Sequence, residues 1–209
     1  GQPPAGGAGA LPPSPVPAMN PAPAREALVL GLGTAGGAIV RSLRAVNPPG
    51  LRFAVLDTDP AVLTRGEPAE VLFLGGALTR GLGAGGDADL ARSCAEEDAA
   101  RLRPLFHGAT HVLLVAGLGG GCAAGVAPVV ARLAREAGAM VLAFVTLPFS
   151  HEGSRREQQA GLAVNRLRHL SAGVLALPND RAADLLDART SLVGAFALTA
   201  NLAADAAAT

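Results

Sequence analysis

The chain has 209 residues, half of them hydrophobic, and its 17 basic residues balance 17 acidic ones. This length suits one sizeable domain, the hydrophobic content argues against overall disorder, and the neutral charge argues against a strongly basic nucleic-acid binder. Lysine is absent, which excludes the P-loop NTPases because their phosphate-binding motif requires a lysine. The lack of Trp and Tyr leaves no obvious stacking platform for nucleic-acid bases.

The chain begins with a segment of unusual composition. Residues 1–24 carry no charge and hold eight of the 16 prolines, without the basic start and unbroken apolar segment of a secretory signal. We therefore expect a disordered Pro/Ala/Gly-rich tail over residues 1–25. The two cysteines form neither a metal pattern nor a disulfide framework, and no apolar run reaches transmembrane length, so a reduced, cytoplasmic setting is expected.

From Glu26 onward, short aliphatic runs alternate with longer Ala/Arg/Leu segments. Strands are predicted at 27–32, 52–57, 70–75, 111–116, 140–146 and 173–178. Helices are predicted to begin near Gly36, Pro60, Asp87, Cys122, Gly153, Arg181 and Ser191. The strands are continuously apolar, which is typical of a parallel sheet covered on both faces. This alternation predicts a doubly wound α/β domain, in which ligands bind beyond the carboxyl ends of the strands.

The first glycine-rich loop follows the first predicted strand. Gly31, Gly33 and Gly36 fit G-x-G-x-x-G, and Asp57 lies at the end of the next strand, about 20 residues on, where a dinucleotide site places its ribose-binding acid. By itself this pattern favours an NAD-binding Rossmann enzyme. The alternative interpretation is a tight strand-to-helix turn with close helix packing.

A second glycine-rich loop, "GLGGGCAAG" over 117–125, favours a different ligand. A helix predicted near Cys122 adds its positive end to the backbone N–H groups of the glycines. A third segment, "TRGLGAGG" over 79–86, adds more donors, and Arg80 is either a phosphate contact or a solvated charge. Glycine-rich loops that face one another would suit a nucleotide di- or triphosphate, because they can hold its phosphates from both sides. Cys122 as a nucleophile with His151 as its base is the weaker idea, and a small polar filler is preferred.

The order of these motifs resembles the GTP-binding domain of the FtsZ family, the bacterial relatives of tubulin. Five motifs occur in the family's order and at its spacing: "TRGLGAGG", "GLGGG", "APVVARLA", "LPFSHEGSRR" and "LPNDR". "DTDPAVL" is also similar to the family's segment after the second strand. The resemblance runs from about Ala27 to the C-terminus. It implies a GTP-binding domain over 26–190 and the start of a central helix over 191–209, with the family's following domain absent.

The resemblance also implies a set of residues that bind GTP or GDP, and it leaves Mg²⁺ open as a companion cation. The set is Gly33, Gly36, Gly37, Ala84, Gly85, Gly86, Gly119, Gly120, Gly121, Cys122, Gly125, Glu152, Arg156, Asn179 and Phe196. The glycines and Ala84 would surround the phosphates, Glu152 and Arg156 would lie at the ribose, Asn179 at the guanine edge and Phe196 against the base. From the residues alone, Glu152 is equally a helix cap and Asn179 a turn residue.

Several positions depart from the family's pattern. Cys122 and Ala124 stand where the family carries hydroxyl residues, and each lost hydroxyl costs about 1 kcal/mol of binding. Other departures are Thr34, Ala35 and Ala123 in place of glycines, Ala38 in place of Asn, and Ala200 in place of a guanine-binding Asp or Asn.

The resemblance implies that catalytic acids come from a loop beyond the central helix, whereas this sequence stops at Thr209. We therefore expect no catalytic residue within the chain. Asp87 is the only acid expected near the phosphate loops, and it is predicted to cap the helix that follows.

The sequence thus predicts the nucleotide-binding domain of an FtsZ-like GTPase that polymerises head to tail with itself or with FtsZ-like subunits, with a role in cell division. Nucleic acid is not an expected partner. The alternatives are a degenerate relative that acts by protein contact without hydrolysis and, less favoured, the NAD-binding enzyme.

Overall fold

The computed structural model describes residues 26–46, 50–63 and 70–184. The tail predicted over 1–25, the helix predicted near Ser191, and Phe196 lie outside these residues.

The described chain forms one parallel sheet of six strands, at the places that the sequence predicts. The strands are β1 (Glu26–Leu32), β2 (Leu51–Asp57), β3 (Glu70–Phe73), β4 (Ala109–Gly117), β5 (Met140–Leu147) and β6 (Gly173–Pro178). Their order is β3-β2-β1-β4-β5-β6, and every neighbouring pair is parallel. The doubly wound α/β fold is therefore confirmed.

Helices connect the strands. The longer ones are α1 (Gly33–Val46), α4 (Ala88–Glu97), α6 (Gly121–Glu136) and α7 (Ser154–Leu170). The shorter ones are α2 (Pro60–Leu63), α3 (Gly76–Thr79), α5 (Ala99–Leu102), α8 (Asn179–Asp184) and two 3₁₀ turns, η1 (Arg103–Phe106) and η2 (Ser150–Glu152). Predicted helix starts differ most at α1, which begins three residues before Gly36, and at α8, which begins two residues before Arg181.

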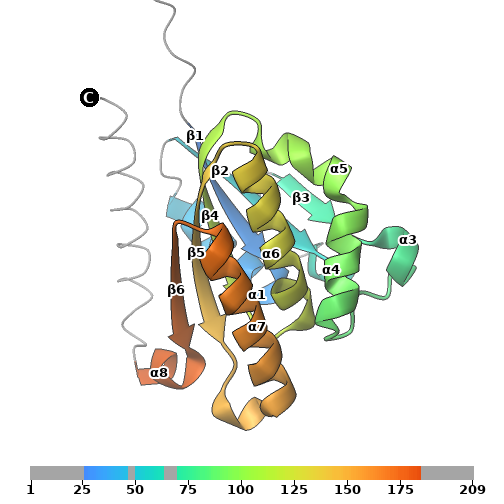
Figure 1. Ribbon diagram of the computed structural model, residues 1–209, viewed down its shortest axis with the longest axis vertical. Helices are drawn as coiled ribbons and strands as arrows, with labels where there is room; N and C mark the ends of the chain where they lie inside the picture. Colours follow the sequence, from blue (N-terminus) through green and yellow to red (C-terminus); the bar gives the residue numbers. More distant parts are fainter. Residues whose placement is uncertain (1–25, 47–49, 64–69, 185–209) are drawn as a thin grey trace, which may run out of the picture.

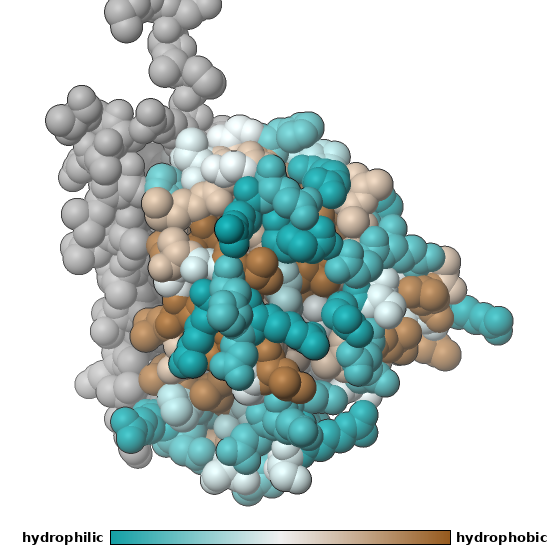
Figure 2. Space-filling model, viewed as in Figure 1, coloured by the Kyte–Doolittle hydropathy of each residue, from teal (hydrophilic) through white to brown (hydrophobic). Residues whose placement is uncertain are grey.

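The two faces of the sheet carry separate hydrophobic cores. The larger core joins even-numbered residues of β4, such as Val112 and Leu114, to the buried sides of α4, α6 and α7. The smaller core packs Val40 and Leu43 of α1 against Val115 on the opposite face. Figure 1 shows α4, α6 and α7 as a layer in front of the sheet, and Figure 2 shows hydrophilic side chains over their outer sides. The sequence's prediction of strands buried on both faces holds for the centre of the sheet.

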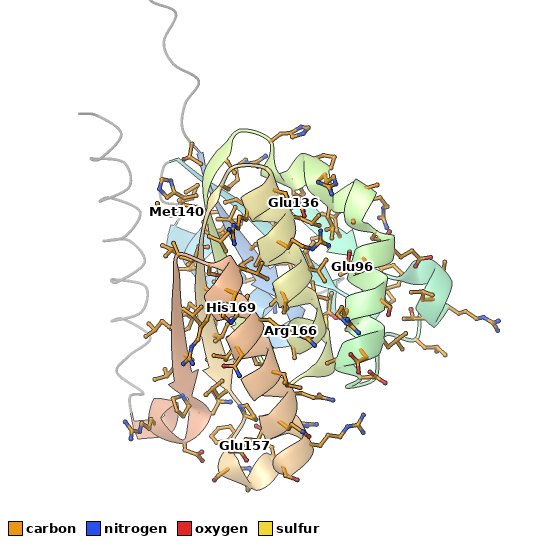
Figure 3. The ribbon with its side chains drawn as sticks, in the orientation of Figure 1. Glu96, Glu136, Met140, Glu157, Arg166 and His169 are labelled. Carbon is orange, nitrogen blue, oxygen red and sulfur yellow. The ribbon has the colours of Figure 1, made fainter. Side chains whose placement is uncertain are left out.

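Charged side chains also tie the front layer together. Arg132 of α6 bonds Glu96 of α4 at 2.6 Å and Glu136 at 2.8 Å, and Arg103 of η1 reaches Glu136 at 3.0 Å. Figure 3 labels Glu96 and Glu136 on these neighbouring helices. The cluster is partly exposed, so it stabilises the α4–α6 contact only modestly.

The start of α4 is capped as predicted. Asp87 accepts hydrogen bonds from the backbone N–H groups of Asp89 and Leu90, at 2.9 and 3.1 Å, and these bonds lower the pKa of its carboxyl. None of the helices among the described residues is long and apolar enough to cross a bilayer.

Candidate functional site

A cavity of about 420 Å³ opens at the carboxyl end of the sheet. It is lined by the loops that follow four neighbouring strands, namely residues 33–35 after β1, 57–59 after β2, 82–86 after β3, and 117 with 120–123 after β4. Arg156 of α7 completes the lining. Since the strand order turns between β1 and β4, the cavity lies at the topological switch point, where open α/β sheets bind their ligands.

The loop after β1 uses its glycines in two ways. Gly33 has φ of +69°, a conformation that favours glycine, and it lines the cavity. Gly36 lies so close to the carbonyl oxygen of Val115 that a methyl group would collide with it, and Gly31 packs against Gly36 in turn. Gly37 faces Val55 of β2. Only Gly33 of the three glycines predicted to bind nucleotide here therefore lines the cavity, together with Thr34 and Ala35.

The loop after β4 leads into α6 without a side-chain cap. Gly120 occupies the N-cap in an extended conformation, with open space where a Cβ would stand. The first N–H groups of a helix have no partner inside it, and those of Gly121, Cys122 and Ala123 belong to residues that line the cavity. An uncapped helix start with backbone donors at a cavity is a ready site for an anion.

Other glycines of this second loop serve packing. A Cβ at Gly121 would collide with the backbone of Gly86 and Asp87, and one at Gly125 with Ala88 and Arg92 of α4. These contacts join the second loop to the third. Gly125 and Gly119 lie outside the cavity lining, whereas Gly121 lines it as well.

The third loop curves over the cavity. Gly83, Gly85 and Gly86 have φ between +56° and +86°, and a Cβ at Gly85 or Gly86 would meet nothing within 4 Å. The backbone N–H of Ala84 donates to the buried Thr58 hydroxyl at 3.2 Å, which fixes the loop to the end of β2. Arg80 is exposed and is not among the lining residues, so it has no contact with the cavity here.

Asp57 lies on the cavity floor. The residue is 3% exposed, and its carboxylate accepts the backbone N–H of Asp59 at 3.0 Å and a hydrogen bond from the Cys122 thiol. Burial raises the pKa of Asp57, because water no longer solvates its charge. Burial, together with the nearby Asp57 charge, raises the pKa of Cys122 to about 12. A thiol with a raised pKa stays protonated at neutral pH, which supports the interpretation of Cys122 as a small polar filler.

Glu152 and Arg156 form a pair beside the second loop. Glu152 accepts the backbone N–H of Phe149 at 2.7 Å and the Arg156 guanidinium at 2.6 Å, and both bonds lower its pKa. The carboxylate lies 3.4 Å from where a Cβ of Gly119 would stand. His151, the residue that the sequence offers as a base for Cys122, stacks on Phe149 and is not among the residues that line the cavity.

The "LPNDR" segment is held next to this pair. Asp180 accepts hydrogen bonds from the backbone N–H and hydroxyl of Ser150, at 3.0 and 3.3 Å. This contact joins the first turn of α8, where Asn179 begins the helix, to η2, where Glu152 ends it. Glu152 and Asn179 therefore come from two connected turns, although neither lines the cavity.

The structure thus brings together eight of the predicted site residues: Gly33, Ala84, Gly85, Gly86, Gly120, Gly121, Cys122 and Arg156. It leaves Gly36, Gly37, Gly119, Gly125, Glu152 and Asn179 outside the lining. The expectation that Asp87 is the only acid near the loops is wrong, because Asp57 and Asp59 both line the cavity. Asp57, Thr58 and Asp59 stand at the end of the second strand, and this position could have identified all three as cavity residues from the sequence.

Comparison with known proteins agrees with this geometry. The model of the GTPase domain of the Tubulin/FtsZ family matches residues 26–187. The chain belongs to this family.

Among curated members of the Tubulin/FtsZ family, Cell division protein FtsZ 2 of Rhizobium meliloti is 38% identical over 168 residues, which are 80% of this chain and 49% of that protein. The solved FtsZ of M. jannaschii, an empty dimer, matches with a TM-score of 0.77 at 30% identity. The match covers 83% of this chain and 53% of the M. jannaschii chain. CetZ2 of Haloferax volcanii, solved as a GTPγS-bound protofilament, matches with a TM-score of 0.70 at 28% identity. This match covers 85% of this chain and 57% of the CetZ2 chain. The chain spans about half the length of these relatives.

Proposed function

We propose that this domain binds GTP or GDP with the phosphates in the cavity between the glycine loops. The observation that carries the proposal is the meeting of three glycine-rich loops around one uncapped helix start, because backbone N–H groups and the helix dipole favour a phosphate there. A nucleotide di- or triphosphate fills such a cradle from several sides. CetZ2 of Haloferax volcanii, which has a similar structure, was solved with GTPγS bound.

The base and ribose ends of the nucleotide are assigned from the family's motifs. Glu152 accepts hydrogen bonds from ribose hydroxyls, Arg156 lies near ribose and base, and Asn179 bonds the guanine edge. The Ser150–Asp180 contact supports this assignment because it holds the turns of Glu152 and Asn179 together. Phe196 as a base-stacking residue lies outside the described residues and stays a prediction.

Many glycines of the motif support the site indirectly. Gly36 lets α1 lie against β4, and Gly125 lets α6 lie against α4, so both keep the loops in place without touching phosphate. The described residues contain no group of three or more His, Cys, Asp or Glu suited to a metal. A Mg²⁺ ion that accompanies the nucleotide would therefore find no set of three protein ligands among these residues, and phosphate oxygens and water would supply most of its coordination.

We propose further that the parent protein polymerises head to tail and hydrolyses GTP between subunits, as part of cell division. Phosphoryl transfer is mostly positioning and charge stabilisation, so residues of a neighbouring subunit can complete a site whose own loops only hold the phosphates. The alternative is a relative that acts by protein contact without hydrolysis.

A charge placed in the cradle tests nucleotide binding. Gly120 has N-cap geometry, where Asp is a favoured residue, so Gly120→Asp should leave the fold intact. Its carboxylate would repel the phosphates, and we expect GTP and GDP affinity to fall at least tenfold. Gly161→Asp is the matched control, since Gly161 lies on α7 away from the cavity with open space around it.

The measurement is titration calorimetry with GTP, GDP, ATP and NAD. Binding of guanine nucleotides that is lost in Gly120→Asp and kept in Gly161→Asp supports the proposal. Binding of NAD alone overturns it in favour of the dinucleotide interpretation of Gly31, Gly33, Gly36 and Asp57. Absence of any nucleotide binding favours the relative that acts by protein contact.

A further inference from the structure

The proposed phosphate cavity has an unusual charge inventory. Among the described residues that line it, the charged ones are Asp57, Asp59 and Arg156. Arg156 is ion-paired with Glu152 at 2.6 Å. The lining therefore offers backbone donors but no surplus positive charge, and it contains two carboxyl groups where a phosphate would also bring negative charge.

Asp57 is the more deeply placed of the two acids. The residue is 3% exposed, and the donors to its carboxylate are backbone N–H groups of the following residues and the Cys122 thiol, all of them neutral. A buried carboxylate without a cationic partner is less stable than the same group in water. Protonation neutralises its charge without requiring any neighbouring group to move.

The groups that face Asp57 are few. Asp59 of the same loop adds negative charge, and Arg156 of α7 lines the same cavity as the one cation among the described lining residues. Cys122 of α6 has its pKa raised to about 12 and stays neutral through the physiological range. The lining residues of the β1 loop and of the third loop carry no titratable side chain. Burial already raises the pKa of Asp57, and a phosphate entering the cavity would raise it again.

We propose that Asp57 takes up a proton from solvent when the nucleotide binds, so that a neutral carboxyl group faces the phosphates. The inference rests on the proposed function. The step is balanced: one solvent proton bonds to a carboxylate oxygen of Asp57, no other bond changes, and the new O–H can donate to a phosphate oxygen. Guanine-nucleotide affinity then decreases as the pH rises between the pKa of Asp57 in the free protein and its higher value in the complex.

The test is calorimetric titration of the 209-residue chain with GDP at several pH values, in pairs of buffers with different ionisation enthalpies. In the wild type we expect net proton uptake of up to one per nucleotide, and affinity that falls by up to tenfold per pH unit within the window. The terminal phosphate titrates in the same range, with a pKa near 6, so the quantity of interest is the difference from Asp57→Asn. That variant keeps an oxygen acceptor, loses the titration, and should bind GDP more tightly than the wild type at high pH.

Asp89→Asn serves as the matched control, because Asp89 is an exposed residue of α4 outside the cavity lining. It should keep the proton uptake of the wild type. If Asp57→Asn does not fold, as judged by circular dichroism, Asp57→Ser replaces it.

Proton uptake that is equal in wild type and Asp57 variant, or absent from the wild type, overturns the inference while leaving the proposed function standing. Absence of guanine-nucleotide binding at every pH, in wild type and variant alike, overturns the proposed function and the inference with it.

Discussion

The two glycine-rich loops, after β1 and after β4, resemble each other in sequence but differ in what their glycines contact. In the first loop the tight contacts join α1 to the centre of the sheet, because Gly31 of β1 packs on Gly36 and Gly36 packs on Val115 of β4. In the second loop they cross to another segment, because Gly121 and Gly125 pack on residues 86–92. The first loop therefore fixes α1 to the central strands, whereas the second is a joint between helices α6 and α4 that also sets the position of the third loop.

This difference separates stability from ligand binding. A change in the first loop's packing glycine should weaken the fold as a whole. A change in the second loop's packing glycine should displace α4 and residues 84–86, and so should alter the cavity as well.

The largest effect is expected for Gly36→Ala. The new methyl would collide with the carbonyl oxygen of Val115, and neither central backbone can move freely. We expect a loss of about 3 kcal/mol in the free energy of unfolding, measured by urea denaturation. Gly37→Ala is the control, with its Cβ 3.3 Å from a Val55 methyl and a gain in helix propensity. Equal losses in both variants would contradict the distinction.

Gly125→Ala should cost less stability but affect both properties. Its methyl would collide with the Ala88 carbonyl and the Arg92 backbone, and α4 can shift to relieve the collision. We expect about 2 kcal/mol lower stability and roughly tenfold weaker GDP binding. Gly161→Ala on α7 should bind normally and gain stability. If Gly125→Ala is destabilised but binds GDP with unchanged affinity, the packing of the second loop on α4 does not control the shape of the cavity.

Asp57→Asn tests the buried carboxyl group that contacts the second loop through Cys122. At low pH the carboxyl is protonated in both folded and unfolded chains, and the variant should match the wild type. As the pH rises, the unfolded chain loses its proton first because the folded pKa is raised, so wild-type stability decreases relative to the variant. We expect Asp57→Asn to be more stable by about 1 kcal/mol at pH 8, with no difference near pH 3. Thermal unfolding across this range measures it, and an advantage greatest at low pH would reverse the argument.

Ala123→Gly should improve binding slightly. The Ala123 methyl faces Gly33 across the cavity, 3.7 Å from where a Cβ of Gly33 would stand. Its removal widens the space between the first and second loops, and we expect about threefold tighter GDP binding, with about 1 kcal/mol lower stability because glycine disfavours the helix. Ala124 is 3% exposed and outside the lining, so a hydroxyl there would not reach the phosphates. Weaker binding by Ala123→Gly would mean that the methyl does not narrow the cradle.

Gly120→Ala should have the smallest effect. Its Cβ would meet nothing within 4 Å and its φ is ordinary, so we expect a stability change below about 0.5 kcal/mol in the same urea experiment. A loss as large as that of Gly125→Ala would show that the open and packed glycines of this loop are not distinct.

Sequence periodicity predicted all six strands because each is a short apolar run bounded by glycine or polar residues. It did not predict α3, α5 or the 3₁₀ turns, since segments of three or four residues have no period to detect. Asp87 as a helix cap was predictable from its type and position, and the structure confirms it.

The sequence did not predict which glycines pack against other segments and which border the cavity. Gly36 and Gly120 look alike in a motif, yet one packs on a neighbouring strand and the other borders open space. Asp57 was noticed for its place after β2, but its contact with Cys122 depends on the register that brings β2 and α6 to one cavity.

The pairing of β1 with β4 also has a consequence for how the chain folds. All of α1 to η1 separates these strands in sequence, yet they are neighbours in register from Leu28 with Val112 to Leu32 with Ala116. During synthesis, β1 therefore has one unpaired edge until β4 leaves the ribosome, and its leucines stay uncovered until α6 follows. Such late, non-local pairing slows folding and leaves aggregation-prone surface exposed. A chaperone would therefore act on the N-terminal half of the chain before β4 and α6 have been synthesised.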